Sequence, residues 1–135
     1  MKLTCYVIDD EPLAVSLLES YVKKTPFLAL EGTFNSAIHA LTAISDHPVD
    51  ILFLDIQMPE LNGLEFSKMV DTHTRIVFTT AFDQYAIDGY RVNALDYLLK
   101  PIDPRRLAKT LQHIRAGESR APAPTPGQAP QYLRH

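Results

Sequence analysis

Several features that define common protein classes are scarce or missing in this sequence. The chain of 135 residues has one cysteine and no tryptophan. That cysteine, Cys5, cannot form a disulfide within the chain, and its place in an apolar run favours a buried thiol over a redox role. No apolar run approaches the roughly 18 residues of a membrane-spanning helix, and Asp9 and Asp10 come too early for a signal peptide. We therefore expect a cytoplasmic protein that does not enter the membrane.

An excess of positive charge is also missing. The formal net charge is −3, with 13 Lys and Arg residues against 16 Asp and Glu residues. Non-specific binding to the phosphates of DNA depends on a basic surface, so we do not expect this chain to bind DNA by itself. The 46% of hydrophobic residues can form one core, but the chain is short for two domains. One domain with an appendage is the economical interpretation.

The C-terminal segment is the expected appendage. The apolar periodicity stops at Gly117, and residues 119–130 are mainly Ala and Pro with some Gly and Gln. This composition is typical of a semi-rigid, partly extended linker. We therefore divide the chain into a domain of residues 1–116 and an Ala/Pro-rich linker of residues 117–135. We expect the linker to lead to an output domain that is absent from this sequence.

Strands and helices are predicted to alternate five times. Apolar runs without alternation are typical of strands covered on both faces, and they occupy residues 5–8, 51–54, 76–78 and 97–99, with a weaker run at 29–34. Between them, apolar residues recur at helical spacing: Leu13, Leu17 and Tyr21; Ile38, Leu41 and Ile44; Phe66, Met69 and Val70; Tyr85, Ala86 and Tyr90; Leu107, Leu111 and Ile114. We predict a doubly wound α/β fold, with a five-stranded parallel sheet and helices on both faces.

Residues that favour helix starts support this division of the chain. Pro12 suits the first turn of a helix, because its missing N–H would have no partner there. Ser36 is a candidate N-cap, and Asp103 followed by Pro104 predicts a cap and a first-turn proline.

Polar residues stand at the predicted strand ends, and parallel strands bring those ends to one edge of the sheet. Asp9 and Asp10 end the first strand, Asp55 the third, Thr80 the fourth and Lys100 the fifth. Ligands of doubly wound sheets bind at this edge. Carboxylates crowded within a few ångströms repel one another unless a cation lies among them. Mg²⁺ takes oxygen ligands and commonly keeps waters and a phosphate oxygen, so the sequence predicts a magnesium site.

These residues are also suited to phosphoryl transfer. The carboxylate of Asp55 can attack phosphorus, the hydroxyl of Thr80 can bond an oxygen of the product, and Lys100 with Mg²⁺ can neutralise the transferred charge. Each residue has a structural alternative. Asp9 and Asp10 suit a helix cap, Asp55 a loop acid, Thr80 a turn hydroxyl and Lys100 a solvated strand end. Their conjunction at one edge favours the chemical interpretation.

Four segments resemble the receiver domains of two-component response regulators. They are residues 7–12 (VIDDEP), 54–59 (LDIQMP) with 61–63 (LNG), 79–81 (TTA) and 94–101 (ALDYLLKP). The resemblance covers about residues 1–116 and implies the flavodoxin-like receiver fold. Segments 81–86 and 92–97 further resemble the receivers of LytTR-type (LytR/AlgR) transcriptional regulators, in which the receiver is attached to a DNA-binding domain.

The resemblance assigns a role to each acid. It implies that Asp55 is the phosphoacceptor and that Asp10, Asp55 and the backbone carbonyl of Gln57 bind Mg²⁺, with Asp9 assisting indirectly. Lys100 would pair with the phosphoryl group. The cofactor implied is therefore Mg²⁺.

The resemblance also implies a switch. The hydroxyl of Thr80 would move toward the phosphate and the ring of Tyr97 would turn inward, although a surface ring on a strand remains the alternative for Tyr97. Two further positions fit the family: Gly63 is expected to adopt a positive φ in the loop beside the site, and Pro101 is expected to follow a cis peptide bond that directs Lys100 inward.

The implied function is a signalling switch rather than a turnover enzyme. A sensor histidine kinase would donate the phosphoryl group, and the receiver would catalyse only its own phosphorylation and dephosphorylation. The surface formed by the fourth helix, fifth strand and fifth helix would change and form a homodimer. DNA would be reached only through the missing C-terminal domain.

Three other functions fit the sequence less well. A haloacid-dehalogenase-like phosphatase needs a second Asp two positions after the nucleophile, where this chain has Gln57. A flavodoxin-like cofactor binder needs a phosphate loop after the first strand, where this chain has acids. A degenerate receiver, used only as a scaffold, would not need the full set of acids, Thr80 and Lys100.

Overall fold

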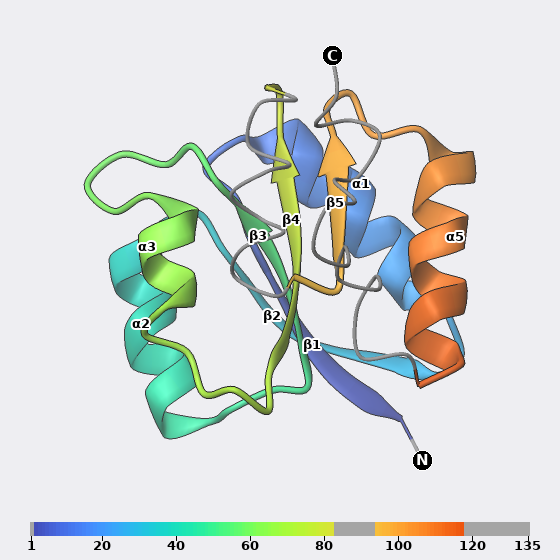
Figure 1. The fold of residues 1–135 in the computed structure, drawn as a ribbon, viewed down its shortest axis with the longest axis horizontal. Coiled ribbons are helices and arrows are strands. Elements are labelled where there is room, and N and C mark those ends of the chain that lie inside the picture. Colours follow the sequence, from blue (N-terminus) through green and yellow to red (C-terminus); the bar gives the residue numbers. More distant parts are fainter. Residues whose placement is uncertain (1, 83–93, 118–135) are drawn as a thin grey trace, which may run out of the picture.

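A single parallel sheet forms the centre of the molecule. The computed structural model describes residues 2–82 and 94–117. Its strands are β1 (Leu3–Ile8), β2 (Leu28–Phe34), β3 (Ile51–Asp55), β4 (Arg75–Thr80) and β5 (Asp96–Leu99). They lie in the order β2-β1-β3-β4-β5, and every neighbouring pair is parallel. The predicted doubly wound sheet is confirmed, and its five carboxyl ends lie at one edge (Figure 1).

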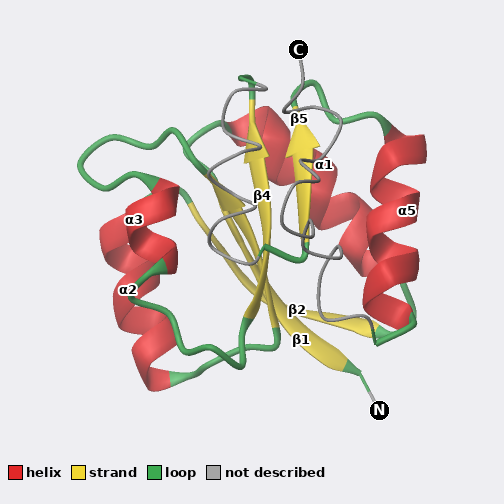
Figure 2. Ribbon diagram, viewed as in Figure 1, coloured by secondary structure: helices red, strands yellow, loops and turns green. Residues whose placement is uncertain are grey.

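Helices cover both faces of the sheet, as predicted. They are α1 (Pro12–Lys23), α2 (Ala37–Asp46), α3 (Gly63–Ser67) and α5 (Pro104–Arg115). Helices α1 and α5 pack on one face, and α2 and α3 pack on the other (Figure 2). The helix expected around Tyr85 and Tyr90 lies outside the described residues, as does the linker beyond Gly117.

The predicted helix starts agree with the structure. Pro12 is the first residue of α1. Asp103 is the N-cap of α5, and its carboxylate accepts a hydrogen bond from the N–H of Arg105 at 2.9 Å. Ser36 occupies the N-cap of α2, but its side chain makes no capping hydrogen bond with the described part of the chain.

The buried faces of α1 and α2 are rotated from those that the large apolar residues predicted. Leu13, Ile38 and Met69 are 83%, 53% and 60% exposed. Helix α1 instead buries Ala14, Leu18 and Val22, whereas α2 buries the predicted Ile44 together with Ala37 and Ala40. Alanines allow a helix to lie close to the sheet, whereas the larger neighbouring side chains would hold it away. Met69 follows the end of α3, so helical spacing does not apply to it.

The sheet separates two apolar clusters. Val7, Phe53 and Val77 belong to the cluster beneath α1 and α5, whereas Leu54 and Phe78 belong to the one beneath α2 and α3. All five residues of β3 are buried, as expected for a central strand covered on both faces. Burial of a large apolar side chain contributes about 1.5–3 kcal/mol. The acid that ends β3 is therefore held on a strand that is packed on both faces.

A polar network joins α5 to the edge strand β5. Arg106 donates to both carboxylate oxygens of Asp96, with the Nη1–Oδ2 distance at 2.9 Å, and Thr110 donates to Oδ2 at 2.6 Å. Burial acts to raise the pKa of Asp96, but these hydrogen bonds and the charge of Arg106 outweigh it and lower that pKa. The network fixes α5 relative to β5.

Gly63 supports the loop after Asp55 in a different way from the one predicted. Among the described residues, positive φ angles occur at Glu60 and Gly117 and not at Gly63. The N–H of Gly63 donates to the carbonyl of Ile56 at 2.7 Å. A Cβ at this position would lie 2.8 Å from the Cα of Ile56 and closer still to the main-chain oxygen of Asp55. Glycine is therefore required by the close approach of two main-chain segments.

Gly63→Ala should destabilise the domain by about 1–3 kcal/mol, because the clash is with backbone that cannot rotate away. Gly32→Ala is the matched control, since its added Cβ would meet only side-chain atoms at 3.5–3.6 Å, an ordinary contact distance. Urea unfolding of both variants measures the difference. Equal stability of the two variants would show that the loop can shift and that the close approach is not a constraint.

Candidate functional site

Three carboxylates meet at the carboxyl edge of the sheet. Asp9 and Asp10 follow β1, and Asp55 is the last residue of β3, the strand beside it. One carboxylate oxygen from each residue lies within 4.8 Å of the others. Asp9 and Asp55 are 0% and 2% exposed, whereas Asp10 is exposed. The predicted convergence of acids from two segments is confirmed.

The main chain orients the two buried acids. The N–H of Asp9 donates to the carbonyl of Phe34 at 2.9 Å, which extends the pairing of β1 with β2. The Oδ1 atom of Asp9 accepts from the N–H of Glu11 at 2.9 Å, and Oδ1 of Asp55 accepts from the N–H of Gln57 at 3.2 Å. Asp9 thus supports the turn into α1, but it does not cap the helix as its structural alternative proposed, because the N-cap is Glu11. Both carboxylates are oriented by these main-chain hydrogen bonds.

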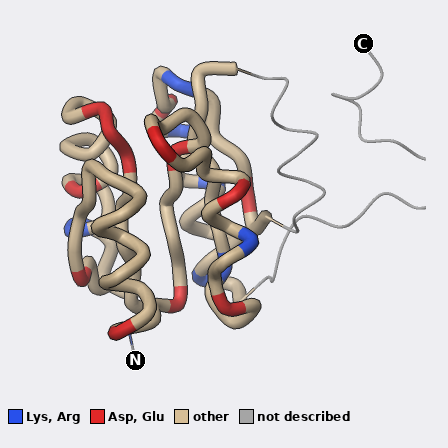
Figure 3. The backbone as a smooth tube through the Cα atoms, turned by 90° about the vertical axis from the view of Figure 1, so that its left-hand side faces the viewer, with Lys and Arg blue, Asp and Glu red and all other residues tan. Residues whose placement is uncertain are grey.

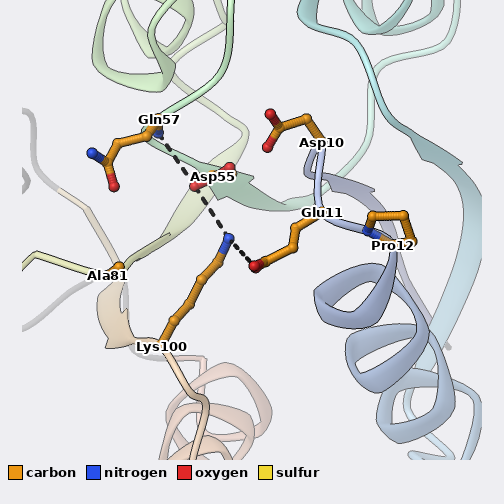
Figure 4. Close-up of a pocket in the computed structure, with 7 residues that line it drawn as sticks. All are labelled: Asp10, Glu11, Pro12, Asp55, Gln57, Ala81 and Lys100. Carbon is orange, nitrogen blue, oxygen red and sulfur yellow. Dashed lines mark hydrogen bonds and ion pairs between the residues drawn. The ribbon is translucent and has the colours of Figure 1, made fainter.

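Lys100 brings a cation to these acids from the other side of the pocket. Its N–H donates to the carbonyl of Thr80 at 2.7 Å, and the peptide bond between Lys100 and Pro101 is cis, as expected. The ammonium lies 2.9 Å from Oδ2 of Asp9. It also lies 3.1 Å from Oε1 of Glu11 and 3.5 Å from Oδ1 of Asp55 (Figure 4). One cation therefore contacts three acids.

Burial and neighbouring charges shift the pKa values of two groups at the site. Burial, followed by the charge of Asp9, raises the pKa of Asp55 from 3.8 to about 7. The charge of Lys100 and the hydrogen bond from Gln57 oppose this rise. Burial acts to lower the pKa of Lys100, but its hydrogen bond with Asp9 and the charges of Asp55 and Asp9 outweigh it, so the pKa of Lys100 is raised.

The donor set fits a hard divalent cation. Asp9, Asp10 and Asp55 supply only oxygen atoms, and Lys100 is one positive charge among them and Glu11. Oδ2 of Asp9 is buried and, although close to the ammonium, accepts no well-directed hydrogen bond from the described residues. Hard cations such as Mg²⁺ bind carboxylate and carbonyl oxygens and keep several waters. A bound metal ion would neutralise the negative charge of the acids that Lys100 alone leaves unbalanced.

Asp10 and Asp55 open onto a pocket. Its volume is about 340 Å³, and it is lined by Asp10, Glu11, Pro12, Asp55, Gln57, Ala81 and Lys100. Water occupies about 30 Å³ per molecule in the liquid, so the pocket has room for an ion, several waters and a phosphoryl group. In Figure 4 the side chain of Lys100 reaches across the pocket from β5 toward Asp55 and Glu11.

Thr80 and Tyr97 lie beside the pocket and share a neighbour. Thr80 is 0% exposed, and its hydroxyl donates to Oε1 of Gln57 and accepts from the N–H of Phe82, both at 3.2 Å. Tyr97 is half-buried and its hydroxyl donates to the carbonyl of Phe82 at 2.7 Å. The main chain of Phe82 thus joins the two residues that were predicted to form a switch.

Comparison with known proteins identifies this arrangement. The family model of the response regulator receiver domain matches residues 5–112. The chain belongs to this family.

Relatives of this receiver domain are about twice its length. It is 44% identical over 116 residues to the transcriptional regulatory protein BtsR of Escherichia coli K12, a match that covers 84% of this chain and 48% of BtsR. An uncharacterized response regulatory protein of Vibrio vulnificus is 44% identical over 119 residues, which are 87% of this chain and 49% of the relative. The receiver therefore spans about half the length of the curated relatives it matches.

Solved receiver structures share the fold. The response regulatory domain of protein mrkE from Klebsiella pneumoniae has a TM-score of 0.80 and 28% identity, and the match covers 85% of this chain and 97% of that domain. The response regulator domain of Thermotoga maritima CheB has a TM-score of 0.76 at 24% identity, covering 90% of this chain and all (100%) of that domain. The latter likeness concerns the fold alone.

The receiver brings together Asp9, Asp10, Asp55 and Lys100, and places Thr80 and Tyr97 next to them. Their individual roles stay predictions. The sequence did not reveal Glu11 as a partner of the lysine, although a third acid after the first strand could have suggested it. The bond from Thr80 to the Gln57 side chain had no signal in the sequence. None of the helices in the described part of the receiver combines the length and the apolar character needed to cross a membrane.

Proposed function

We propose that this receiver accepts a phosphoryl group on Asp55 from a sensor histidine kinase, with Mg²⁺ as cofactor. The observation that carries the proposal is the convergence of Asp9, Asp10 and Asp55 within 4.8 Å on a pocket that Lys100 crosses. A carboxylate that ends a buried strand and opens on a pocket is both rigid and accessible to a donor.

The proposed reaction makes one bond and breaks one. An oxygen of the Asp55 carboxylate attacks phosphorus, the N–P bond of phosphohistidine breaks, and its electron pair stays on the imidazole nitrogen. A small acyl phosphate would react in the same way with cleavage of an O–P bond. The nucleophile must be ionised, and the ammonium of Lys100 at 3.5 Å favours that form. The same ammonium is placed to pair with the phosphoryl oxygens.

The metal ligands would be Asp10, Asp55 and the backbone carbonyl of Gln57, with Asp9 acting indirectly. When bound, Mg²⁺ neutralises charge on the transferring phosphoryl group. The exposure of Asp10 at the pocket supports a direct role for it, because its carboxylate faces the space that the ion and its waters need. Asp9 is buried and directed at Lys100, which supports an indirect role.

Phosphorylation would operate a switch. A phosphoryl group adds charge and bulk that Thr80 and Lys100 contact only in that state, and such differential contacts bias two pre-existing conformations. A shift of the ratio of the two conformations from 1:99 to 99:1 needs about 5.5 kcal/mol. A few charge-assisted hydrogen bonds can supply this free energy. Tyr97 would follow Thr80, and the surface of the fourth helix, β5 and α5 would change and form a homodimer. The fourth helix lies outside the described residues.

The output would come from the rest of the protein. The match covers only 48% of BtsR, which is named a transcriptional regulatory protein. This partial coverage supports an output domain attached beyond the linker of residues 117–135. We propose that this domain is of the LytTR type and binds DNA. The receiver itself is not proposed to bind DNA, because the formal net charge of the chain is −3 and, in the view of Figure 3, Asp and Glu positions occur among the Lys and Arg positions. Nor is it proposed to be a turnover enzyme, and we place it in the cytoplasm.

Incubation with acetyl phosphate and intact-mass measurement tests the proposal. The wild-type chain should gain one phosphate with Mg²⁺ and none with EDTA, and Asp55→Ala should gain none in either case. Equal labelling of Asp55→Ala would remove Asp55 from its role. Sustained hydrolysis of phosphomonoesters would favour the dehalogenase-like phosphatase instead.

A further inference from the structure

We propose that the side-chain amide of Gln57 is a latch on Thr80, which lowers the affinity of the receiver for a phosphoryl group by occupying the hydrogen that Thr80 would donate to it. This inference rests on the proposed function and adds a regulating residue to the same site. Gln57 acts through Thr80, so it is a positioning residue.

The single hydrogen of the Thr80 hydroxyl is already donated to Gln57. The N–H of Phe82 donates to Oγ1 of Thr80, and Oγ1 donates in turn to Oε1 of Gln57, both at 3.2 Å. A hydroxyl carries a single hydrogen. Thr80 is 0% exposed, so water does not offer it another partner. Thr80 can therefore donate to a phosphoryl oxygen only after it releases Gln57.

Gln57 is placed to respond to the state of Asp55. Its N–H donates to Oδ1 of Asp55 at 3.2 Å, which fixes its main chain beside the phosphoacceptor. Its side chain lines the pocket in which a phosphoryl group on Asp55 would lie (Figure 4). The hydroxyl of Thr80 is a donor from which a phosphoryl oxygen can accept a hydrogen bond. Phosphorylation would thus compete directly with the bond between the two side chains.

The expected size of the effect follows from the single bond involved. Loss of one neutral hydrogen bond corresponds to about a two- to tenfold change in an equilibrium constant. Removal of the acceptor should therefore tighten binding of a phosphoryl mimic by about that factor. The tightening should require the hydroxyl of Thr80, which distinguishes a latch from a general change in the pocket.

A double-mutant cycle on the whole chain tests the latch. Beryllofluoride, a stable mimic of the phosphoryl group, is titrated at a fixed excess of Mg²⁺, and the bound fraction is measured by ¹⁹F NMR. Gln57→Met, which keeps the length of the side chain and removes its amide, should bind about two- to tenfold more tightly than wild type. In a Thr80→Val background the same substitution should not tighten binding. Thr80→Ser keeps the hydroxyl and should restore the effect of Gln57→Met.

Two results would overturn the latch while the proposed function stands. One is an equal change in beryllofluoride affinity when Gln57→Met is made in the wild-type and Thr80→Val backgrounds, because Gln57 would then act on the pocket without Thr80. The other is unchanged or weaker binding by Gln57→Met with Thr80 present. If Thr80→Val does not fold, Thr80→Ala provides a second background without the hydroxyl, and Gln57→Met should again fail to tighten binding in it. If wild type binds no beryllofluoride and takes up no phosphate, the proposed function fails and the latch with it.

Discussion

Asp55→Asn should make the metal-free domain more stable than wild type by up to roughly 4 kcal/mol at pH 8. The reason is the pKa of Asp55, which burial and the charge of Asp9 raise from 3.8 to about 7 in the folded state. A carboxyl group whose pKa is higher in the folded state than in the unfolded state makes the fold less stable as the pH rises from about 4 through about 7. Asparagine remains neutral and does not incur this loss.

The pH dependence and a control make this prediction specific. The difference between Asp55→Asn and wild type should close as the pH falls toward 4, because wild-type Asp55 is then protonated as well. Asp46→Asn, at the exposed end of α2, should change stability by less than about 0.5 kcal/mol. Urea unfolding in EDTA from pH 4 to pH 8 measures both variants. Mg²⁺ should then stabilise wild type more than Asp55→Asn. A stability difference between Asp55→Asn and wild type that does not change with pH would show that the pKa of Asp55 is not raised in the fold.

Lys100→Met should have the opposite effect and destabilise the metal-free domain by about 3–5 kcal/mol, because it leaves Asp9 and Asp55 buried without their cation. The Lys100 side chain is 14% exposed, so solvent screens its ion pairs only weakly. Its pKa is raised in the fold, so its contribution is fully present at pH 8 and is lost only above its usual pKa of 10.5. The pKa of Asp55 should rise further in this variant, since Lys100 acts to lower it.

A surface lysine provides the comparison. Lys23 pairs with Glu19 on α1 at 2.8 Å, with 62% of the lysine side chain exposed. Lys23→Met should therefore cost less than about 1 kcal/mol. Thermal or urea unfolding of both variants, with and without Mg²⁺, measures the contrast. Mg²⁺ should recover part of the loss in Lys100→Met, and a loss no larger than that of Lys23→Met would contradict a buried charge cluster.

The sequence was informative wherever position along a strand determines position in space. A run of apolar residues predicted each strand of the sheet, and the rule that parallel strands end at one edge then brought Asp9, Asp10, Asp55 and Lys100 together. The continuous burial of β3 follows from the same reasoning. These inferences depend only on the path of the backbone, so the sequence was sufficient to locate the site.

Inferences that depend on side-chain packing were less accurate. Leu13 and Ala14 are adjacent on α1, and only the distance from the helix to the sheet decides that the alanine is buried and the leucine is exposed. Gly63 was expected to need an unusual backbone angle, but the structure gives it a steric role. The hydrogen bond from Thr80 to Gln57 joins residues from two strand ends, and its direction depends on rotamers that a sequence pattern does not encode.

Locating the phosphoryl group tests the central claim most directly. After reaction with acetyl phosphate and Mg²⁺, borohydride reduces an acyl phosphate on aspartate to homoserine, and peptide mass spectrometry identifies the position. We predict homoserine at position 55 of the wild-type chain, and none when EDTA is present during phosphorylation. Homoserine at position 9 or 10 in place of position 55, or none with Mg²⁺ present, would contradict the account.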